Sequence, residues 1–486
     1  MATDQVRTRT APSPTGESHI GHIRTVLYNF ALAKKNKGHF ILRIEDTDRG
    51  RYVEGAVDRI LNVIGDYGLS WDEGPRVGGP YEPYFQSQRL EIYKKHAREL
   101  VEKGHAYYCF CSQERLNDVR KKQQEQKLPT TKYDRYCRNL SKEEADKKLA
   151  NGDLYVIRQK IPDDATVTFH DEVLGDVSIN SNDIEDGVLL KSDGFPTYHL
   201  AVVIDDYLMK ITHIMRGCDW IPSTPKHVLL YKAFGWELPK YIHLPNLKEI
   251  GGNKKLSKRF GSTGANEFLA EGYLPEAVLN FLMLIGWNSG TEKEIYSLDE
   301  FINDFSLERV HKTDLVAFDR EKLLWYNGYY IRSLSTKELF NRLLSWSVKY
   351  EQDLGIDGYS HDYAIKVLAL LQDRIKTLSE FSQLTGYFFG NLKQDKKIIS
   401  RFTKSEQIAK NILNDFYNVL STVEYRKDVL DSECHRLIDQ KGYKTKEAFM
   451  TLRLALTGVE ATPHIFDVIE VLGKEETLKR IKFYLD

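Results

Sequence analysis

The first 45 residues constrain the fold of this chain more than any other part of it. A short alternating run from Gln5 to Thr10 leads into a proline-containing loop, and from Ile23 onward apolar residues recur at helical spacing. We expect the helix to end near Gly38, which would supply a left-handed cap, and a second strand to follow from His39 to Glu45. This order predicts a parallel βαβ unit, whose first loop lies at the sheet edge where such folds bind nucleotides.

That loop carries residue types suited to binding phosphate. From Arg9 to Arg24 it reads Arg-Thr-Ala-Pro-Ser-Pro-Thr-Gly-Glu-Ser-His-Ile-Gly-His-Ile-Arg. Its glycines let the main chain approach a ligand, and His19 and His22 stand at the start of a helix, whose amino end favours anions. On these residues alone, a surface feature or a fragment of a metal site is an equal alternative. The chain has no Gly-x-Gly-x-x-Gly here, so a dinucleotide-binding fold is not indicated.

A second motif, far along the chain, favours phosphate chemistry. Lys255-Leu256-Ser257-Lys258-Arg259 lies between Gly251-Gly252 and Gly261, so its cations are on a loop with glycine hinges. A mobile basic loop that faces a histidine-bearing loop suits adenylate formation, because negative charge then builds up on the phosphorus and on the departing pyrophosphate.

Together the two motifs resemble the paired signatures of class I aminoacyl-tRNA synthetases. The flanking residues resemble the bacterial-type glutamyl-tRNA synthetases in particular, over essentially the whole chain, in Ala11-Pro12-Ser13-Pro14-Thr15-Gly16, Arg43-Ile44-Glu45-Asp46-Thr47-Asp48-Arg49 and Phe195-Pro196-Thr197-Tyr198-His199-Leu200-Ala201. The resemblance implies an α/β Rossmann-like catalytic domain with an inserted α+β acceptor-binding domain, a stem-contact region and an all-α carboxyl-terminal anticodon-binding domain.

The domain boundaries are expected where helical and strand patterns change. The two halves of the catalytic domain are assigned to residues 1–75 and 191–250, and the inserted domain between them to residues 76–190. The KMSKS-type basic loop with the stem-contact region is assigned to 251–330, and the helical domain to 331–486. The apolar stretches from Gly187 to Lys191 and from Leu200 to Ile204 are predicted to be interior strands of the catalytic sheet, joined by a strand from Thr212 to Met215.

The activity that the resemblance implies is ATP-dependent ligation of L-glutamate to the 3′ end of tRNA(Glu) through a glutamyl-adenylate, with release of AMP and pyrophosphate. Magnesium would be held mainly by ATP oxygens, so the absence of a carboxylate cage is no objection. The residues expected to carry the chemistry are His19, His22, Lys255 and Lys258. ATP is expected to contact Ser13, His19, Gly21, His22, Ser257 and Lys258.

Recognition of glutamate requires a cation for its side chain and an anion for its ammonium group. The resemblance assigns Arg9 to the side-chain carboxylate, which a guanidinium can bind through two parallel hydrogen bonds, and Glu45 to the ammonium group. The full expected set is Arg9, Ala11, Ser13, Glu45, Tyr198 and Arg216. The alternative for Arg9 and Glu45 is an ion pair with each other on adjacent strands.

Two further sites follow from the resemblance. Cys109, Cys111 and Cys137 with Tyr133 resemble a zinc site of some family members, although Asn139 stands where a histidine often lies; the alternative is three reduced thiols. Arg374 resembles the arginine that faces the third anticodon base and is associated with selection of tRNA(Glu), and the alternative is a solvated cation at a helix end.

The composition is typical of a soluble globular protein and argues against a membrane protein. The chain is 41% hydrophobic and 29% charged with a formal net charge of -1, and it has no apolar run of membrane-spanning length. We therefore expect a cytoplasmic monomer without a membrane partner. A small-molecule nucleotidyltransferase, an enzyme that glutamylates a modified base, a non-catalytic tRNA-binding paralogue and a synthetase that also charges tRNA(Gln) are the alternatives.

Overall fold

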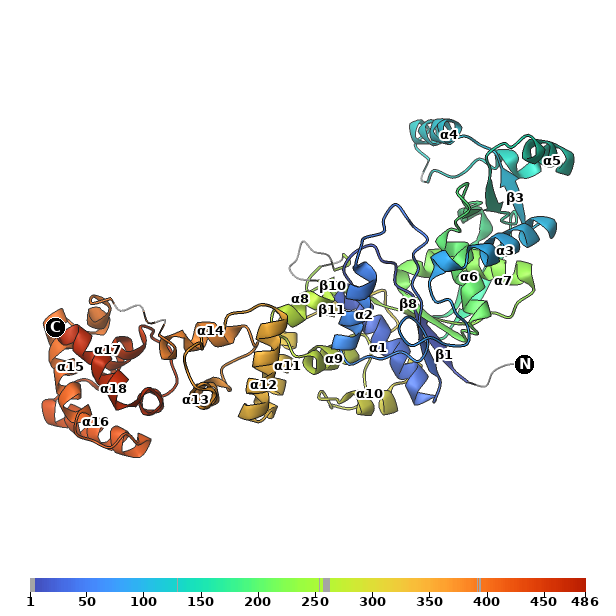
Figure 1. The fold of residues 1–486 in the computed structure, drawn as a ribbon. Helices are drawn as coiled ribbons and strands as arrows, with labels where there is room; N and C mark the ends of the chain where they lie inside the picture. Colours follow the sequence, from blue (N-terminus) through green and yellow to red (C-terminus); the bar gives the residue numbers. More distant parts are fainter. Residues whose placement is uncertain (1–4, 129, 253, 257–262, 391, 393–394) are drawn as a thin grey trace. The chain divides into compact units, whose positions relative to one another are not determined.

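The computed structural model describes the chain except residues 1–4, 129, 253, 257–262, 391 and 393–394, and it divides into two compact units (Figure 1). Unit 1 comprises Met1–Phe268 and Val278–Arg320, and unit 2 comprises Leu269–Ala277 and Glu321–Asp486. Among the described residues, no helix is both long and apolar enough to cross a membrane.

The predicted βαβ unit is present. Strand β1 (Arg7–Thr10), helix α1 (Ile20–Lys35) and strand β2 (His39–Leu42) follow one another, and the two strands pair in parallel with Arg9 opposite Ile41. The expected cap at Gly38 is wrong, because the left-handed residue after the helix is Lys37, with φ 52°. Gly38 is needed for close packing instead, since a Cβ at this position would lie 1.9 Å from the carbonyl oxygen of Val6.

A four-stranded sheet adjoins this unit. Its order is β6 (Gly175–Asn180), β5 (Thr166–Asp171), β9 (Lys240–Leu244) and β8 (His213–Gly217), with β9 parallel to both β5 and β8. The strand predicted from Thr212 to Met215 is thus confirmed as β8. Arg7 and Thr212 exchange main-chain and hydroxyl hydrogen bonds, so β1 meets the start of β8. Strand β5, from the range expected to form an insertion, is therefore part of the sheet that carries Arg216.

Two segments predicted to be strands of the catalytic sheet are not part of it, so this prediction is wrong. Leu200 to Ile204 lies inside helix α6 (Tyr198–Leu208), and periodicity alone cannot separate a fully buried helix from an interior strand. Strand β7 (Val188–Leu190) exists, but it belongs to a separate three-stranded antiparallel sheet with β4 (Val156–Gln159) and β3 (Ala106–Cys109).

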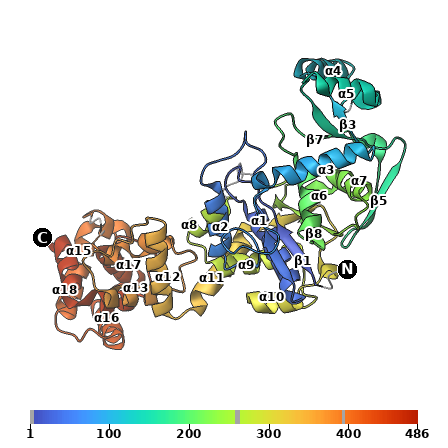
Figure 2. The same ribbon diagram turned by 45° about the vertical axis from the view of Figure 1, so that its right-hand side comes forward.

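The other main elements of unit 1 surround these sheets (Figures 1 and 2). They are α2 (Ala56–Asp66), α3 (Leu90–Glu102), α4 (Gln113–Glu125), α5 (Lys142–Ala150), α7 (Thr224–Phe234), β10 (Asn246–Glu249), α8 (Ala265–Ala270), α9 (Pro275–Leu284), α10 (Leu298–Asp304) and β11 (Leu315–Phe318). Helices α8 and α9 run across the boundaries between the two units.

Unit 2 is helical throughout its described residues, as predicted. Its helices are α11 (Arg320–Ser333), α12 (Thr336–Lys349), α13 (His361–Leu371), α14 (Glu380–Thr385), α15 (Glu406–Leu420), α16 (Lys427–Lys441), α17 (Thr445–Thr457) and α18 (Ile465–Leu485). Serine side chains cap the starts of α12, α13 and α15, and the apolar faces of α15, α17 and α18 pack together (Figure 2). Helix α13 ends at Leu371, and Arg374 lies in the turn that follows.

Candidate active site

His19 caps helix α1. Its Nδ1 accepts a hydrogen bond from the main-chain N–H of His22 at 3.3 Å, so the ring folds back over the first turn. Gly21 makes room for this ring, because a Cβ there would lie 3.1 Å from His19 Nδ1. No described residue bonds the other ring nitrogen, Nε2, so this atom of His19 is available to a ligand.

His22 is occupied within the protein. Its Nε2 lies 2.9 Å from Thr10 Oγ1 and its Nδ1 lies 3.3 Å from Ser18 Oγ. Burial, together with the neighbouring His19, lowers the pKa of His22 to about 3, so the ring is neutral. The structure therefore separates the two histidines that the sequence left equivalent: both ring nitrogens of His22 have hydroxyl partners, whereas Nε2 of His19 has no partner among the described residues.

The segment after the basic loop lies against the histidine loop. The N–H of Ile20 donates to the carbonyl of Thr263 at 2.8 Å, and the N–H of Ala265 donates to that of Ser18 at 2.7 Å. These bonds place the residues that follow the basic motif next to the histidine loop, from which they are far apart in the sequence.

Lys255 pairs with Asp219, with Nζ 2.8 Å from Oδ2. Desolvation lowers the pKa of His19, and the charge of Lys255 lowers it further. Ser257 and Lys258 fall outside the described residues.

Arg9 and Glu45 do not pair with each other. The Nε of Arg9 donates to Asp206 at 3.2 Å, whereas Glu45 accepts from Arg43 at 3.0 Å, so the alternative of a direct ion pair is wrong. Arg43 also donates to Asp206 at 2.8 Å, which gives a buried chain of alternating charges. Burial alone would raise the pKa of Asp206, but Arg9 and Arg43 outweigh it and lower the pKa.

Asp205 belongs to a second part of this network. It accepts hydrogen bonds from Arg89 Nε and Tyr93 hydroxyl, both at 2.7 Å, and from Gln86 at 2.9 Å. Neither Asp205 nor Asp206 lies in a motif that predicts a binding site. The sequence does show two acidic residues directly after an apolar run. A buried helix tolerates such residues only when their charges are paired, so this pattern could have indicated a buried ion-pair network.

Arg216 reaches the same place from the carboxyl end of β8. Its Nη1 donates to the hydroxyl of Tyr198 at 3.2 Å, and its side chain is buried. Among the described residues no carboxylate forms an ion pair with Arg216, whereas Arg9 has Asp206. The charges of Arg9, Glu45 and Arg216 all act on the hydroxyl of Tyr198, so these four predicted residues converge.

The loop from Ala11 to Ser13 runs beside Glu45. The N–H of Glu45 donates to the carbonyl of Pro12 at 3.0 Å, which continues the β1–β2 pairing into the loop. Ala11 and Ser13, two more predicted contacts, are the chain neighbours of the residue whose carbonyl bonds the main chain of Glu45, and Ser13 is exposed.

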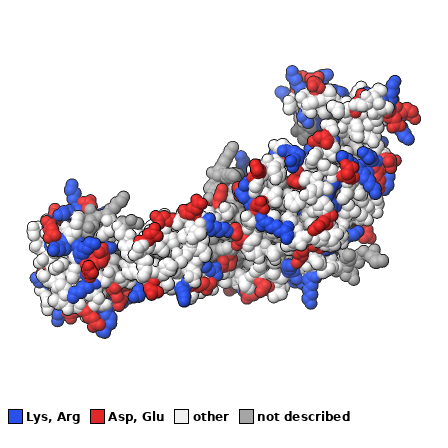
Figure 3. Space-filling model, viewed as in Figure 1, with Lys and Arg blue, Asp and Glu red and all other residues white. Residues whose placement is uncertain are grey.

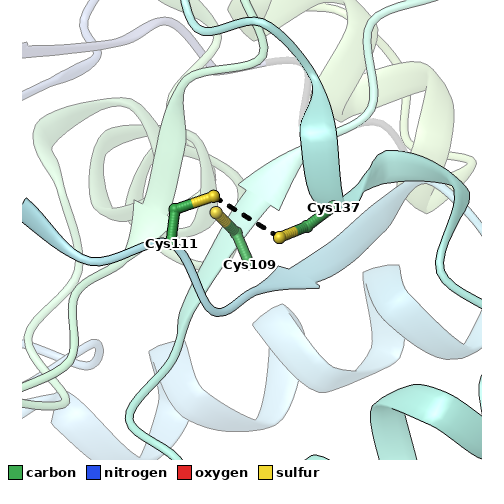
Figure 4. A group of neighbouring side chains, drawn as sticks. All are labelled: Cys109, Cys111 and Cys137. Atoms are coloured by element: carbon green, nitrogen blue, oxygen red, sulfur yellow. Dashed lines mark hydrogen bonds between the residues drawn. The ribbon is translucent and has the colours of Figure 1, made fainter. Parts of the chain in front are cut away.

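The predicted zinc residues form a compact group beside the three-stranded sheet (Figure 4). One sulfur each of Cys109, Cys111 and Cys137 lie within 4.8 Å of one another, and Cys111 Sγ is 3.5 Å from Cys137 Sγ. Thiolates bound to one tetrahedral zinc are about 3.8 Å apart, given a Zn–S bond of about 2.3 Å. The hydroxyl of Tyr133 lies 3.3 Å from Cys109 Sγ and 3.5 Å from Cys111 Sγ, so the donor set fits zinc.

Arg374 is exposed in the turn after α13. Its charge helps to lower the pKa of Arg453, after desolvation, and also acts on Tyr387, so two guanidinium groups lie close together in unit 2. On the face shown in Figure 3, cations and anions are interspersed.

Comparison with known proteins extends over the whole chain. Residues 5–325 match the family described as tRNA synthetases class I (E and Q), catalytic domain, and residues 338–485 match an anticodon binding domain. Glutamate–tRNA ligases of Clostridium botulinum (strain Hall) and Alkaliphilus metalliredigens are 44% and 41% identical, covering 100% and 99% of this chain and 99% of each relative.

Solved structures agree. A glutamate tRNA ligase from Elizabethkingia meningosepticum, in complex with its amino acid, is 35% identical with a TM-score of 0.88, covering 99% of both chains. A glutamate-tRNA synthetase from Elizabethkingia anophelis is 35% identical with a TM-score of 0.87, and the match covers 99% of this chain and 100% of that one. A class I catalytic domain, a helical anticodon-binding domain and relatives of the same length lead to one conclusion: the chain belongs to the glutamate–tRNA ligase family of class I aminoacyl-tRNA synthetases.

Proposed function

We propose that this protein ligates L-glutamate to the 3′ end of tRNA(Glu) in two steps. The α-carboxylate of glutamate attacks the α-phosphorus of ATP and pyrophosphate leaves; a ribose hydroxyl of the terminal nucleotide then attacks the glutamyl carbonyl and AMP leaves. The protein supplies no nucleophile, so its work is to position two anions and to stabilise developing charge. We also propose that it acts as a monomer in the cytoplasm.

The free Nε2 of His19 is proposed to contact the phosphates, with His22 holding the loop. Lys255 and Lys258 are proposed to bind the departing pyrophosphate, and Ser13, Gly21 and Ser257 to contact ATP. Magnesium, when bound, would neutralise charge on the phosphate oxygens. The ion pair of Lys255 with Asp219 is exposed and therefore weak enough to be exchanged for a phosphate contact.

The proposal that glutamate is the substrate amino acid rests on Arg216. This residue is buried, lies beside Tyr198 and has no carboxylate partner among the described residues. A buried cation without a counter-ion favours an anionic ligand. Arg9, one of whose terminal nitrogens has no partner among the described residues, is proposed to bind the same side chain, and Glu45 to bind the ammonium group. An uncharged amide cannot satisfy both guanidinium groups.

The identity of the products tests this proposal against a small-molecule nucleotidyltransferase. With ATP, L-glutamate and tRNA, we expect equal amounts of AMP and pyrophosphate and a base-labile glutamyl ester on the tRNA. A product that keeps the adenylyl group on a small molecule, with no esterified tRNA, would contradict the proposal.

We propose that Cys109, Cys111 and Cys137, with Tyr133 as the fourth donor, hold one structural zinc ion. The purified protein is then expected to contain about one equivalent of zinc, since a site of this donor type retains metal through purification. Cys109→Ser is expected to lose the metal, whereas Cys218→Ser, at an isolated buried cysteine, is expected to retain it. Full activity and stability in a metal-free preparation would favour three plain thiols.

We propose that Arg374 contacts the third anticodon base. Arg374→Gln is expected to raise charging of tRNA(Gln) relative to tRNA(Glu), because a guanidinium that pairs with one base edge is left unsatisfied by another. The neighbouring cation gives a control, since Lys376→Gln is expected to leave the ratio of kcat/KM for the two tRNAs unchanged. An unchanged ratio in Arg374→Gln would assign it to phosphate contact or to the solvated surface, and a high wild-type value for tRNA(Gln) would identify a non-discriminating enzyme.

A further inference from the structure

The guanidinium of Arg216 is surrounded by neutral acceptors. Besides the Tyr198 hydroxyl, Nη2 donates to Thr224 Oγ1 at 2.7 Å and Nε donates to His243 Nε2 at 3.3 Å, while His227 Nδ1 lies 3.4 Å from Nη1. The hydroxyl of Thr224 donates to the carbonyl of Trp220 at 3.0 Å, so towards Arg216 it can only accept. These contacts orient the guanidinium without neutralising it.

The tautomer of His243 follows from its partners. Arginine has no acceptor, so the Nε2 that faces it must carry the lone pair, and the proton must then sit on Nδ1. Asp171 accepts that proton, with Nδ1 2.7 Å from Oδ2, and the same oxygen accepts the main-chain N–H of His243 at 3.0 Å. Both side chains are fully buried. Asp171 therefore holds one tautomer of the ring, as carboxylates do for other functional histidines.

The other oxygen of Asp171 is also committed. It accepts the main-chain N–H groups of Val173 and Leu174 at 3.0 and 2.9 Å. Each printed hydrogen bond of this side chain is thus with a donor, and Asp171 lies at the end of β5, next to β9, which carries His243. The imidazole ring of His243 therefore lies between this carboxylate and Arg216.

We propose that Asp171 and His243 are positioning residues for Arg216: together they hold the guanidinium in place with a neutral ring, so that its charge is left for the side-chain carboxylate of the substrate. A direct aspartate partner, such as Asp206 is for Arg9, would hold Arg216 equally well but would offset the positive charge that Arg216 leaves for the substrate carboxylate. The pKa of His243 is lowered, mainly by burial, and burial lowers the pKa of His227 well below its usual value. Both rings are therefore neutral. This inference rests on the proposed glutamate site.

Two polar substitutions of similar size separate the contact to Arg216 from the contact to Asp171. His243→Gln places a carbonyl oxygen near the position of Nε2 and retains an acceptor for Arg216. His243→Asn places its amide near Nδ1, so it can still donate to Asp171 but does not reach Arg216.

The measurement is the KM for L-glutamate and for ATP in tRNA charging, with thermal denaturation of each variant. We expect His243→Asn to raise the KM for L-glutamate about tenfold, the equivalent of one lost hydrogen bond to a charged group, with the KM for ATP unchanged. We expect His243→Gln to stay within about threefold of the wild type, since it keeps that bond. Equal values for the two variants, or parallel increases for glutamate and ATP, would overturn the inference. A wild-type protein without a saturable dependence on L-glutamate would instead contradict the proposed function.

Discussion

Replacing Asp206 by alanine is expected to lower the free energy of unfolding by about 3 to 5 kcal/mol, because a buried ion pair that loses one partner leaves uncompensated charge. Asp206 accepts from both Arg9 and Arg43, and all three side chains are buried. The measurement is urea-induced unfolding of the wild type and the variant.

An exposed ion pair provides the control for Asp206. Asp58 pairs with Arg76 at 2.7 Å on the surface, so Asp58→Ala is expected to change the free energy by less than about 1 kcal/mol. If both variants gave the same small change, the charge network around Asp206 would not contribute to stability.

Replacing His19 by alanine is expected to slow adenylate formation by about 10² to 10³-fold, because a preorganised donor aimed at developing charge supplies an effect of this size. Unfolding should change little, since the contact of the ring with the described residues is one long cap bond of 3.3 Å. The measurement is single-turnover formation of the adenylate.

His22→Ala separates the two histidines. Both ring nitrogens of His22 contact hydroxyl groups, so this variant is expected to lose about 1 to 3 kcal/mol of stability. Equal loss of adenylate formation with no loss of stability in both variants would contradict the division of roles between His19 and His22.

The βαβ unit and the helical second unit could be predicted because each depends on local pattern. Turn chemistry after Thr10, helical spacing from Ile23 and the helical period beyond Ser333 are all visible in neighbouring residues. Leu200 to Ile204 could not be assigned this way, since a run that is buried on all sides has no polar face to show its period.

The residues of the candidate site that lie in recognisable sequence motifs could be predicted. Arg9, Glu45, Tyr198 and Arg216 were expected together and do converge. Their partners Asp206, Asp171 and His243 come from distant segments that only the tertiary fold brings together, and none lies in a motif with a known spacing. The different roles of the two loop histidines depend on hydroxyl contacts that a sequence does not reveal.

We propose that the two buried guanidinium groups of Arg9 and Arg216 make this enzyme select a carboxylate side chain. The most direct test is the ratio of kcat/KM for L-glutamate to that for L-glutamine in charging of purified tRNA(Glu). We predict a ratio of about 10³ or more, because a neutral amide leaves buried charged donors without their partner. A ratio below about ten, or charging with glutamine alone, would contradict the account of the site.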